Sequence, residues 1–347
     1  MISAFFSNDA RKDSSLLIAE VAQAHDGSLG TAHAFIDAVA AAGVDAVKFQ
    51  THIAEAESTP SEPWRIPFSR QETSRFEYWR RMEFTEEQWH GLKQHADEKK
   101  LIFLSSPFSV EAVELLSRVG VPFWKIASGE VGSFSLLEAV SKTALPVLLS
   151  SGLSSLDETD RAAAFLRSRN LPFAVMQCAT SYPCPPERVG LNMLAAYKER
   201  YGVPVGISDH SGTVYPSLAA AALGATFFEV HVTFSKLMFG PDVSSSVTLE
   251  ELKLLADGVR FIKCAAANPV DKDEQAAALG PLLAVFGKKA VTRSALQAGD
   301  VFTEDVVAFR KSAGGISEGD FAAYIGLKTS CPLASGEVIQ LEHIEKN

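Results

Sequence analysis

The chain has 347 residues, with 42 acidic against 32 basic side chains and a formal net charge of -10. This length suits a barrel of roughly 250 residues followed by a small module better than it suits one ordinary domain. The acidic balance argues against a nucleic-acid-binding face, and no apolar run approaches the ~18 residues that a membrane span needs.

The cysteines and the N-terminus indicate a compartment. None of the four cysteines belongs to a C-x-x-C motif, as expected in a reducing cytosol rather than in a disulfide scaffold. The first 15 residues, MISAFFSNDARKDSS, lack the charged start and apolar run of a signal peptide. We therefore expect a cytoplasmic protein.

From Leu16 onward, short apolar runs alternate with helical patterns. Strands are expected over 16–22, 46–50, 101–107, 123–129, 146–152, 173–179, 204–208 and 227–232. Helices are expected over 31–43, 85–100, 109–119, 135–143, 156–169, 190–201, 216–223 and 248–266. Eight strands that are each followed by a helix predict a TIM (β/α)₈ barrel. An open doubly wound sheet is the alternative, but no G-x-G-x-x-G motif follows the first strand.

Three segments depart from this alternation. Residues 51–84 are rich in Pro, Ser, Arg and aromatic residues, and we interpret them as a loop that covers a substrate. Residues 268–285 have the pattern of a linker, and short β-like pieces between glycine turns follow from 286. The predicted organisation is a barrel over 1–267, a linker over 268–285 and a small domain over 286–347.

Two histidines are expected at the ends of the last two barrel strands. His210 follows the seventh strand, and His231 lies in the eighth on the same face as Glu229, because strand side chains alternate. Imidazoles on neighbouring parallel strands can converge on one divalent metal such as Mn, Fe, Co or Zn. The alternative is that both are ordinary core histidines.

Polar residues are expected at the carboxyl ends of nearly all the strands, where barrel enzymes have their active sites. Lys48 and Lys125 are the most informative, because two ammonium groups on apolar strands require a compensating anion. With nearby hydroxyl groups they would form a phosphate site. An anion site beside a metal suits a phosphorylated substrate that reacts with a polarised carbonyl.

Several stretches in order resemble the sialic acid synthase family, the phosphoenolpyruvate-dependent nonulosonate synthases. They are AEVAQAHDGSLGTA, AGVDAVKFQTH, LSSPFS, WKIASGE, LLSSGLSS, QCATSYPCP, GISDHSG and EVHVT with FGPD. Beyond the barrel, LQAGDVFTEDVVAFRKSAGGIS and IGLKTSCPLASGEVIQLEHI resemble the antifreeze-like (SAF, β-clip) domain of that family. The resemblance covers residues 16 to 345.

This resemblance implies a transferase that condenses phosphoenolpyruvate with the open-chain aldehyde of an N-acylated hexosamine such as N-acetylmannosamine. Water adds, phosphate leaves by C–O cleavage, and the product is a nine-carbon 2-keto acid. A legionaminate- or pseudaminate-type synthase acting on a diacetamido-dideoxyhexose is an alternative. The family is typically a domain-swapped homodimer that uses Mn²⁺ or Mg²⁺, and Co²⁺ is a further candidate.

The resemblance also implies roles for individual residues. His210 and His231 would hold the metal, and Glu20, Glu130, Gln50, Tyr182 and Asp242 would contact the sugar or move protons. Arg310 would enter the site of the partner subunit, near the acyl group of the substrate. The residues expected to bind phosphoenolpyruvate are Lys48, Ser106, Lys125, Ser128, Ser150, Thr180 and Ser208.

Two other functions remain open at this point. A Schiff-base aldolase would use Lys48 or Lys125 as its nucleophile and leave the histidines structural. A non-catalytic carbohydrate-binding barrel would bind sugar without releasing phosphate.

Overall fold

The computed structural model describes residues 2–7 and 13–345, and it separates into two compact units, Met1–Asn268 and Pro269–Asn347. Each unit is described by itself. The expectation about the N-terminus rests in part on residues 1 and 8–12, which lie outside the described residues.

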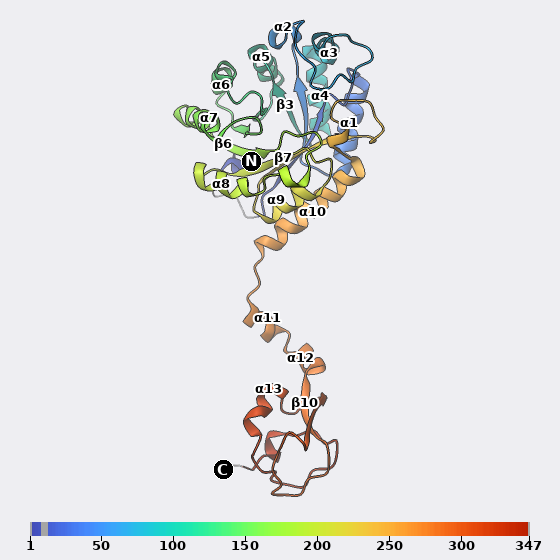
Figure 1. The fold of residues 1–347 in the computed structure, drawn as a ribbon, viewed down its shortest axis with the longest axis vertical. Coiled ribbons are helices and arrows are strands. Elements are labelled where there is room, and N and C mark those ends of the chain that lie inside the picture. Colours follow the sequence, from blue (N-terminus) through green and yellow to red (C-terminus); the bar gives the residue numbers. More distant parts are fainter. Residues whose placement is uncertain (1, 8–12, 346–347) are drawn as a thin grey trace. The chain divides into compact units, whose positions relative to one another are not determined.

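The first unit is a ring of parallel strands surrounded by helices (Figure 1). The hydrogen-bonded order is β3-β2-β1-β8-β7-β6-β5-β4, and every pairing along it is parallel. The two end strands, β3 and β4, pack against each other and close the ring. The strands are β1 Leu16–Ala22, β2 Ala46–Thr51, β3 Ile102–Pro107, β4 Trp124–Ile126, β5 Val147–Ser150, β6 Phe173–Cys178, β7 Val205–Asp209 and β8 Phe227–Thr233. The prediction of a TIM barrel is confirmed.

The surrounding helices begin and end where the sequence supplies caps. The Thr85 and Gln88 side chains form a reciprocal capping box at the start of α4, and α1 ends at Gly43 with a φ of 77°. The helices are α1 Leu29–Ala42, α4 Glu86–Glu98, α5 Val110–Val119, α6 Phe134–Ser141, α7 Leu156–Ser168, α8 Asn192–Tyr201, α9 Tyr215–Ala222 and α10 Leu249–Ala267. A short strand, β9 Ser246–Thr248, pairs with β8 and was not expected.

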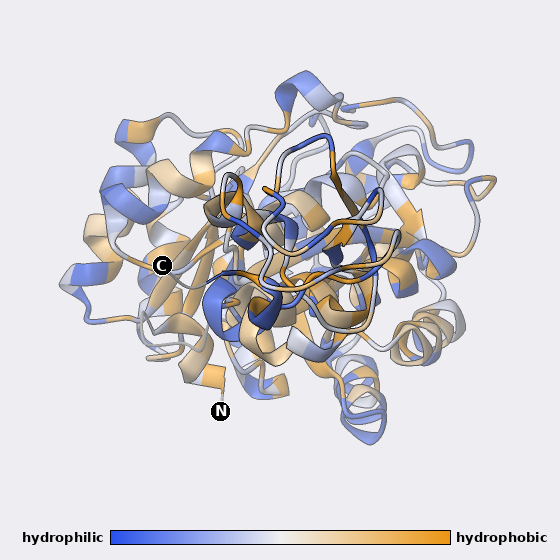
Figure 2. Cartoon of the chain, turned by 90° about the horizontal axis from the view of Figure 1, so that it is seen from below, coloured by the Kyte–Doolittle hydropathy of each residue, from blue (hydrophilic) through white to orange (hydrophobic). Residues whose placement is uncertain are grey.

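Side chains alternate along the strands, so one set packs against the helices and the other points into the barrel. The interior contains both apolar and polar side chains. Val47 and Phe49 of β2 belong to the main core between strands and helices, whereas Lys48 between them belongs to neither apolar cluster of the barrel. The helices that complete this core carry both hydrophilic and hydrophobic residues (Figure 2). A second apolar cluster includes Leu16, Ile18 and Phe227 from the first halves of their strands, capped by Phe6 of η1 Ile2–Phe6. The buried charged side chains of the barrel strands, such as Lys48 and Glu229, therefore lie beyond this apolar cluster.

The segment expected as one long loop contains two helices, α2 Ala54–Glu57 and α3 Arg75–Met82. A capping box between Ser74 and Glu77 starts α3, and the S-x-x-E pattern was a signal for it in the sequence. Tyr78 and Trp79 form a small aromatic core here with their neighbours, so the segment is packed.

The second unit has its own core, which includes Phe302, Phe321 and Ile339. Two strands, β10 Lys288–Thr292 and β11 Val307–Lys311, pair antiparallel. Helices α11 Lys272–Ala278 and α12 Gly280–Phe286 form over the residues whose pattern suggested a linker, and α13 Glu318–Phe321 lies further on. The 3₁₀ turns of the chain are η2 Pro186–Arg188 and η3 Val243–Ser245 in the first unit, and η4 Ala322–Tyr324 and η5 Leu341–His343 in the second. In the described part of the chain, no helix combines the length and hydropathy needed to cross a membrane.

The close approach of β7 to β8 at Gly206 leads to a prediction about stability. A Cβ atom added at Gly206 would lie 2.5 Å from the carbonyl oxygen of Phe227, whereas one added at Gly91 in α4 would meet nothing within 4 Å. Gly206→Ala should lower the free energy of unfolding by about 1–3 kcal/mol. Gly91→Ala, the matched control, should raise it by up to ~1 kcal/mol. Denaturant titration measures both, and unchanged stability in Gly206→Ala would contradict this strand packing.

Candidate active site

Four buried charged side chains lie together inside the barrel, on β1, β2, β4 and β8. The ammonium group of Lys48 pairs with Glu20 and lies 4.0 Å from Glu229. Lys125 Nζ lies 3.2 Å from Glu229 Oε1, and it donates a hydrogen bond of 2.7 Å to Ser150 Oγ. All four charged side chains are at most 5% exposed. We call these four residues the lysine–glutamate cluster.

The two carboxylates of this cluster differ in their electrostatics. Burial raises the pKa of Glu20, and Lys48 only partly opposes this effect. Burial also acts to raise the pKa of Glu229, but Lys125 and Lys48 together lower it below its ordinary value. Glu229 is therefore the firmly ionised member, and Glu20 is the carboxyl group that takes a proton more readily.

Hydroxyl groups surround the lysine–glutamate cluster. Ser208 Oγ donates a hydrogen bond of 3.1 Å to Glu229, and Ser128 is half-buried in the wall of the cavity above. Ser106 Oγ and Thr180 Oγ1 are buried, and they have no hydrogen-bond partner among the described residues. Unpaired buried hydroxyls are costly in an empty site and are free to donate to a bound anion.

The two predicted histidines do converge. The ring centroids of His210 and His231 are 5.2 Å apart. His210 Nδ1 donates to the Ala179 carbonyl at 3.0 Å, so Nε2 carries the lone pair and accepts from Tyr182 Oη at 3.1 Å. Burial, the largest cause, and the neighbouring His231 lower the pKa of His210 to about 3, which keeps its ring neutral near pH 7. Asp242 Oδ2 lies 3.9 Å from His231 Nδ1.

No group of three or more His, Cys, Asp or Glu side chains within residues 2–7 and 13–345 is arranged as a metal site. The histidine pair and Asp242 come nearest to one at this end of the barrel, but Arg65 Nη2 donates to Asp242 Oδ1 at 2.6 Å. A metal role for His210 and His231 therefore stays a prediction.

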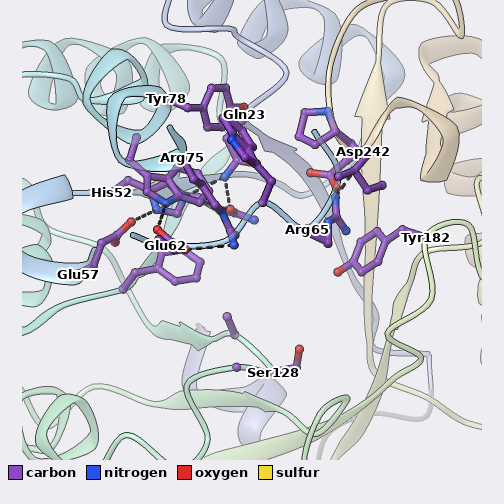
Figure 3. A pocket seen from close by; sticks show the side chains of 18 of the residues that line it. Gln23, His52, Glu57, Glu62, Arg65, Arg75, Tyr78, Ser128, Tyr182 and Asp242 are labelled. Atoms are coloured by element: carbon purple, nitrogen blue, oxygen red, sulfur yellow. Dashed lines mark hydrogen bonds and ion pairs between the residues drawn. The ribbon is translucent and has the colours of Figure 1, made fainter. Parts of the chain in front are cut away.

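A cavity of about 390 Å³, whose lining includes His231, lies at this end of the barrel, and Figure 3 shows part of its lining. It is large enough for a small substrate. One wall comes from segment 57–79, and the opposite wall carries Ser128 and Glu130. Burial and then Glu57 raise the pKa of Glu130, so this carboxyl is suited to giving and taking a proton. Gln50, Thr180, Tyr182, His231 and Asp242 also line the cavity.

Arg65 links residues 51–84, which we call the covering segment, to the side of the cavity that carries His231. Its guanidinium lies 4.2 Å from the centroid of the Tyr182 ring and pairs with Asp242 (Figure 3). Sequence reasoning missed this residue, because a contact between positions 65 and 242 leaves no local pattern. It also missed the cavity-lining residues Gln23, His52, Glu57, Glu62, Trp79 and Arg75.

Glu229 was expected to share a face with His231, but its role as counterion to both lysines was not predicted. Strand alternation showed the direction of its side chain. Its contacts with Lys48 of β2 and Lys125 of β4 depend on the tertiary structure of the barrel. Arg310 is exposed on β11 in the second unit, so the cluster and cavity described here do not include it.

Comparisons with known proteins show the family. Residues 35–271 match the model of the NeuB family. The N,N'-diacetyllegionaminic acid synthase of Campylobacter jejuni is 30% identical over 90% of this chain and 94% of its own length. The human N-acetylneuraminate-9-phosphate synthase is 33% identical over 73% of this chain and 71% of its own length.

Solved structures of similar proteins share this fold. An N-acetylneuraminic acid synthetase from Leptospira borgpetersenii, in complex with citrate, superposes with a TM-score of 0.68 at 28% identity. That match covers 78% of this chain and 92% of the other. A spore coat polysaccharide biosynthesis protein from Bacillus subtilis gives 0.64 at 28% identity over 98% and 97%. The family model spans more than half of this sequence, and the chain belongs to the NeuB family, the sialic acid synthases.

Proposed function

We propose that the chain condenses phosphoenolpyruvate with the aldehyde of an unphosphorylated N-acylated amino sugar and releases phosphate. Membership of the NeuB family already makes it a synthase-type transferase; the substrates are the proposal. The observation that carries it is the lysine–glutamate cluster beneath a cavity with an acidic and aromatic lining.

The lower part of the site suits phosphoenolpyruvate. Lys48 and Lys125 supply two buried positive charges, and Ser106 and Thr180 supply hydroxyls without partners. An entering anion would share the lysines with Glu20 and Glu229, which offsets the cost of removing its charge from water. A Schiff base requires a free amine, whereas both lysine side chains are ion-paired with carboxylates, so the geometry gives the aldolase alternative no support.

The upper cavity suits an uncharged sugar. Its described lining contains four carboxylates, Glu57, Glu62, Glu130 and Asp242. The two arginines of that lining are each engaged by one of them: Arg65 by Asp242 at 2.6 Å and Arg75 by Glu62 at 3.0 Å. A phosphate group on the acceptor would meet this surplus of negative charge, whereas hydroxyl and acylamino groups would not.

Apolar side chains favour acylated or deoxygenated positions on that sugar. Trp64, Ile66, Phe68, Trp79, Phe108 and Leu153 share the lining with the carboxylates. An N-acetylhexosamine and a diacetamido-dideoxyhexose both offer methyl groups to such a wall.

The residues of the histidine pair fit a divalent ion. His210 Nε2 and the neighbouring His231 ring offer imidazole nitrogens, and the Asp242 carboxylate is an oxygen donor. A bound Mn²⁺ or Mg²⁺ would polarise the acceptor aldehyde. Glu20 and Glu130 are the carboxyl groups available to move protons, since burial raises the pKa of each. A domain-swapped homodimer, with Arg310 of the second unit reaching a partner's cavity, is part of the same proposal.

Phosphate release from phosphoenolpyruvate tests the function. The panel is N-acetylmannosamine, its 6-phosphate and a diacetamido-dideoxyhexose, each with Mn²⁺ and with EDTA. We expect release that requires both the metal and one unphosphorylated sugar. A preference for the 6-phosphate would contradict the charge argument. Silence across the panel, together with no phosphoenolpyruvate binding, would contradict the reaction itself.

Glu229→Gln tests the lysine–glutamate cluster. The amide keeps the shape but leaves the two lysines undercompensated, so the free energy of unfolding should fall by about 3 kcal/mol or more. Phosphoenolpyruvate should then raise the midpoint of thermal unfolding more in this variant than in the wild type, because the anion replaces the lost charge. Glu86→Gln, which breaks an exposed pair with Arg118, should change the free energy of unfolding far less. Equal effects of the two substitutions would argue against a buried charge balance.

His231→Ala tests the metal assignment without relying on turnover. Electron paramagnetic resonance of added Mn²⁺ should show one tight site in the wild type and its loss in the variant. His90→Ala, at an exposed position on α4, should keep that site. Tight Mn²⁺ binding that survives in His231→Ala would place the metal elsewhere.

A further inference from the structure

A buried histidine–glutamate pair lies in the cavity wall, outside the lysine–glutamate cluster and the histidine pair. His52 follows β2, Glu57 ends α2, and the distance from His52 Nδ1 to Glu57 Oε1 is 2.5 Å. Their side chains are only 3% and 8% exposed. The His52 ring is stacked between Trp79 and Phe108, with centroid distances of 3.9 and 4.5 Å and interplanar angles of 15°. Stacking therefore fixes the plane of the ring, and the contact with Glu57 fixes the position of its Nδ1 edge.

The other edge of His52 continues into a chain of amides. Gln23 Nε2 lies 2.8 Å from His52 Nε2 and also donates to Gln50 Oε1. Gln50 Nε2 then donates to Glu20 Oε1 at 2.8 Å. Figure 3 shows Gln23 beside His52, with Glu57 on the opposite side of the ring. One line of hydrogen bonds thus runs from the covering segment to the lysine–glutamate cluster.

His52 Nε2 also lies 3.3 Å from Gln50 Oε1, a longer contact than the one with Gln23. The following set of proton positions satisfies the shorter contacts of this line. Glu57 as a carboxylate accepts from Nδ1–H of His52, which leaves Nε2 of that ring as an acceptor. The two hydrogens of the Gln23 amide then serve His52 and Gln50, so the Gln50 oxygen faces Gln23 and its NH₂ group faces Glu20. Without the Glu57 carboxylate the ring can take the other tautomer. Its Nε2–H would then face the NH₂ group of Gln23, and two donors would meet. Reversing Gln23 would bring two amide oxygens together at Gln50.

We propose that His52 and Glu57 are a positioning pair that fixes the amide of Gln50 for the acceptor sugar. Gln50 lines the cavity and is only partly buried, so one side of its amide is available to a ligand. The pair acts through Gln23 and Gln50 and does not touch the reacting atoms. This inference rests on the proposed function, because it needs an acceptor in the cavity. The orientation of that sugar would then depend on a carboxylate that acts on Gln50 through His52 and Gln23.

Glu57→Gln is the central variant, and Glu55→Gln is its matched control. Glu55 lies in the same helix, but its side chain is 68% exposed and pairs with Arg80. In Glu57→Gln, kcat/KM for the acceptor should fall about 10–100-fold, the usual cost of removing a group that orients a functional side chain. The KM for phosphoenolpyruvate should change much less, and Glu55→Gln should match the wild type.

His52→Phe gives a second test, because it keeps a ring between Trp79 and Phe108 and removes the hydrogen bonds. Its effect on acceptor kcat/KM should not add to that of Glu57→Gln, since the two residues act as one unit. NMR of the resting protein with ¹⁵N-labelled histidine should show a far-downfield Nδ1–H proton for His52 that disappears in Glu57→Gln. Equal losses for both substrates, additive effects or an unchanged acceptor kcat/KM would overturn the proposal.

Calorimetry of acceptor binding separates this inference from the proposed function. A wild type that binds the acceptor but releases no phosphate contradicts the function, and the affinities of Glu57→Gln and Glu55→Gln then decide the positioning role. A wild type that binds no acceptor contradicts both.

Discussion

The buried charge balance of Lys48 and Lys125 against Glu20 and Glu229 is the constraint on which the rest of the site depends. Two ammonium groups inside a barrel would destabilise it unless carboxylates compensate them, and Glu229 compensates both. The cluster is possible only because the first halves of the strands fill the interior with apolar side chains. In the proposed function, a substrate anion would take over part of the pairing between these carboxylates and the lysines.

The covering segment connects this cluster to the surface. It supplies Arg65 to Tyr182 and Asp242 on one side of the cavity, and His52 and Glu57 begin a line of hydrogen bonds to Glu20 on the other. In the proposed function, the acceptor and the anion would therefore contact different parts of one hydrogen-bond network. The barrel strands position the groups of the lysine–glutamate cluster, whereas much of the aromatic lining of the upper cavity, including Trp64, Phe68 and Trp79, comes from the covering segment.

Sequence reasoning reached the barrel and much of its interior because strand alternation and helix caps are local signals. Lys48, His210 and His231 could be placed at strand ends in this way. Helix α3 was missed although the Ser74–Glu77 capping pattern was present, because the Pro- and Ser-rich surroundings favoured a loop. Contacts such as Arg65 with Asp242 depend on tertiary packing across 177 positions and leave no periodic signal.

A crystal structure with phosphoenolpyruvate and Mn²⁺ would test the central claim most directly. The account predicts that the phosphate or carboxylate of the ligand contacts Lys48 and Lys125 and that Glu229 gives up part of its pairing. The anomalous signal of Mn²⁺ should lie between His210 and His231. A ligand held elsewhere, with the lysine–glutamate cluster unchanged, would contradict the account.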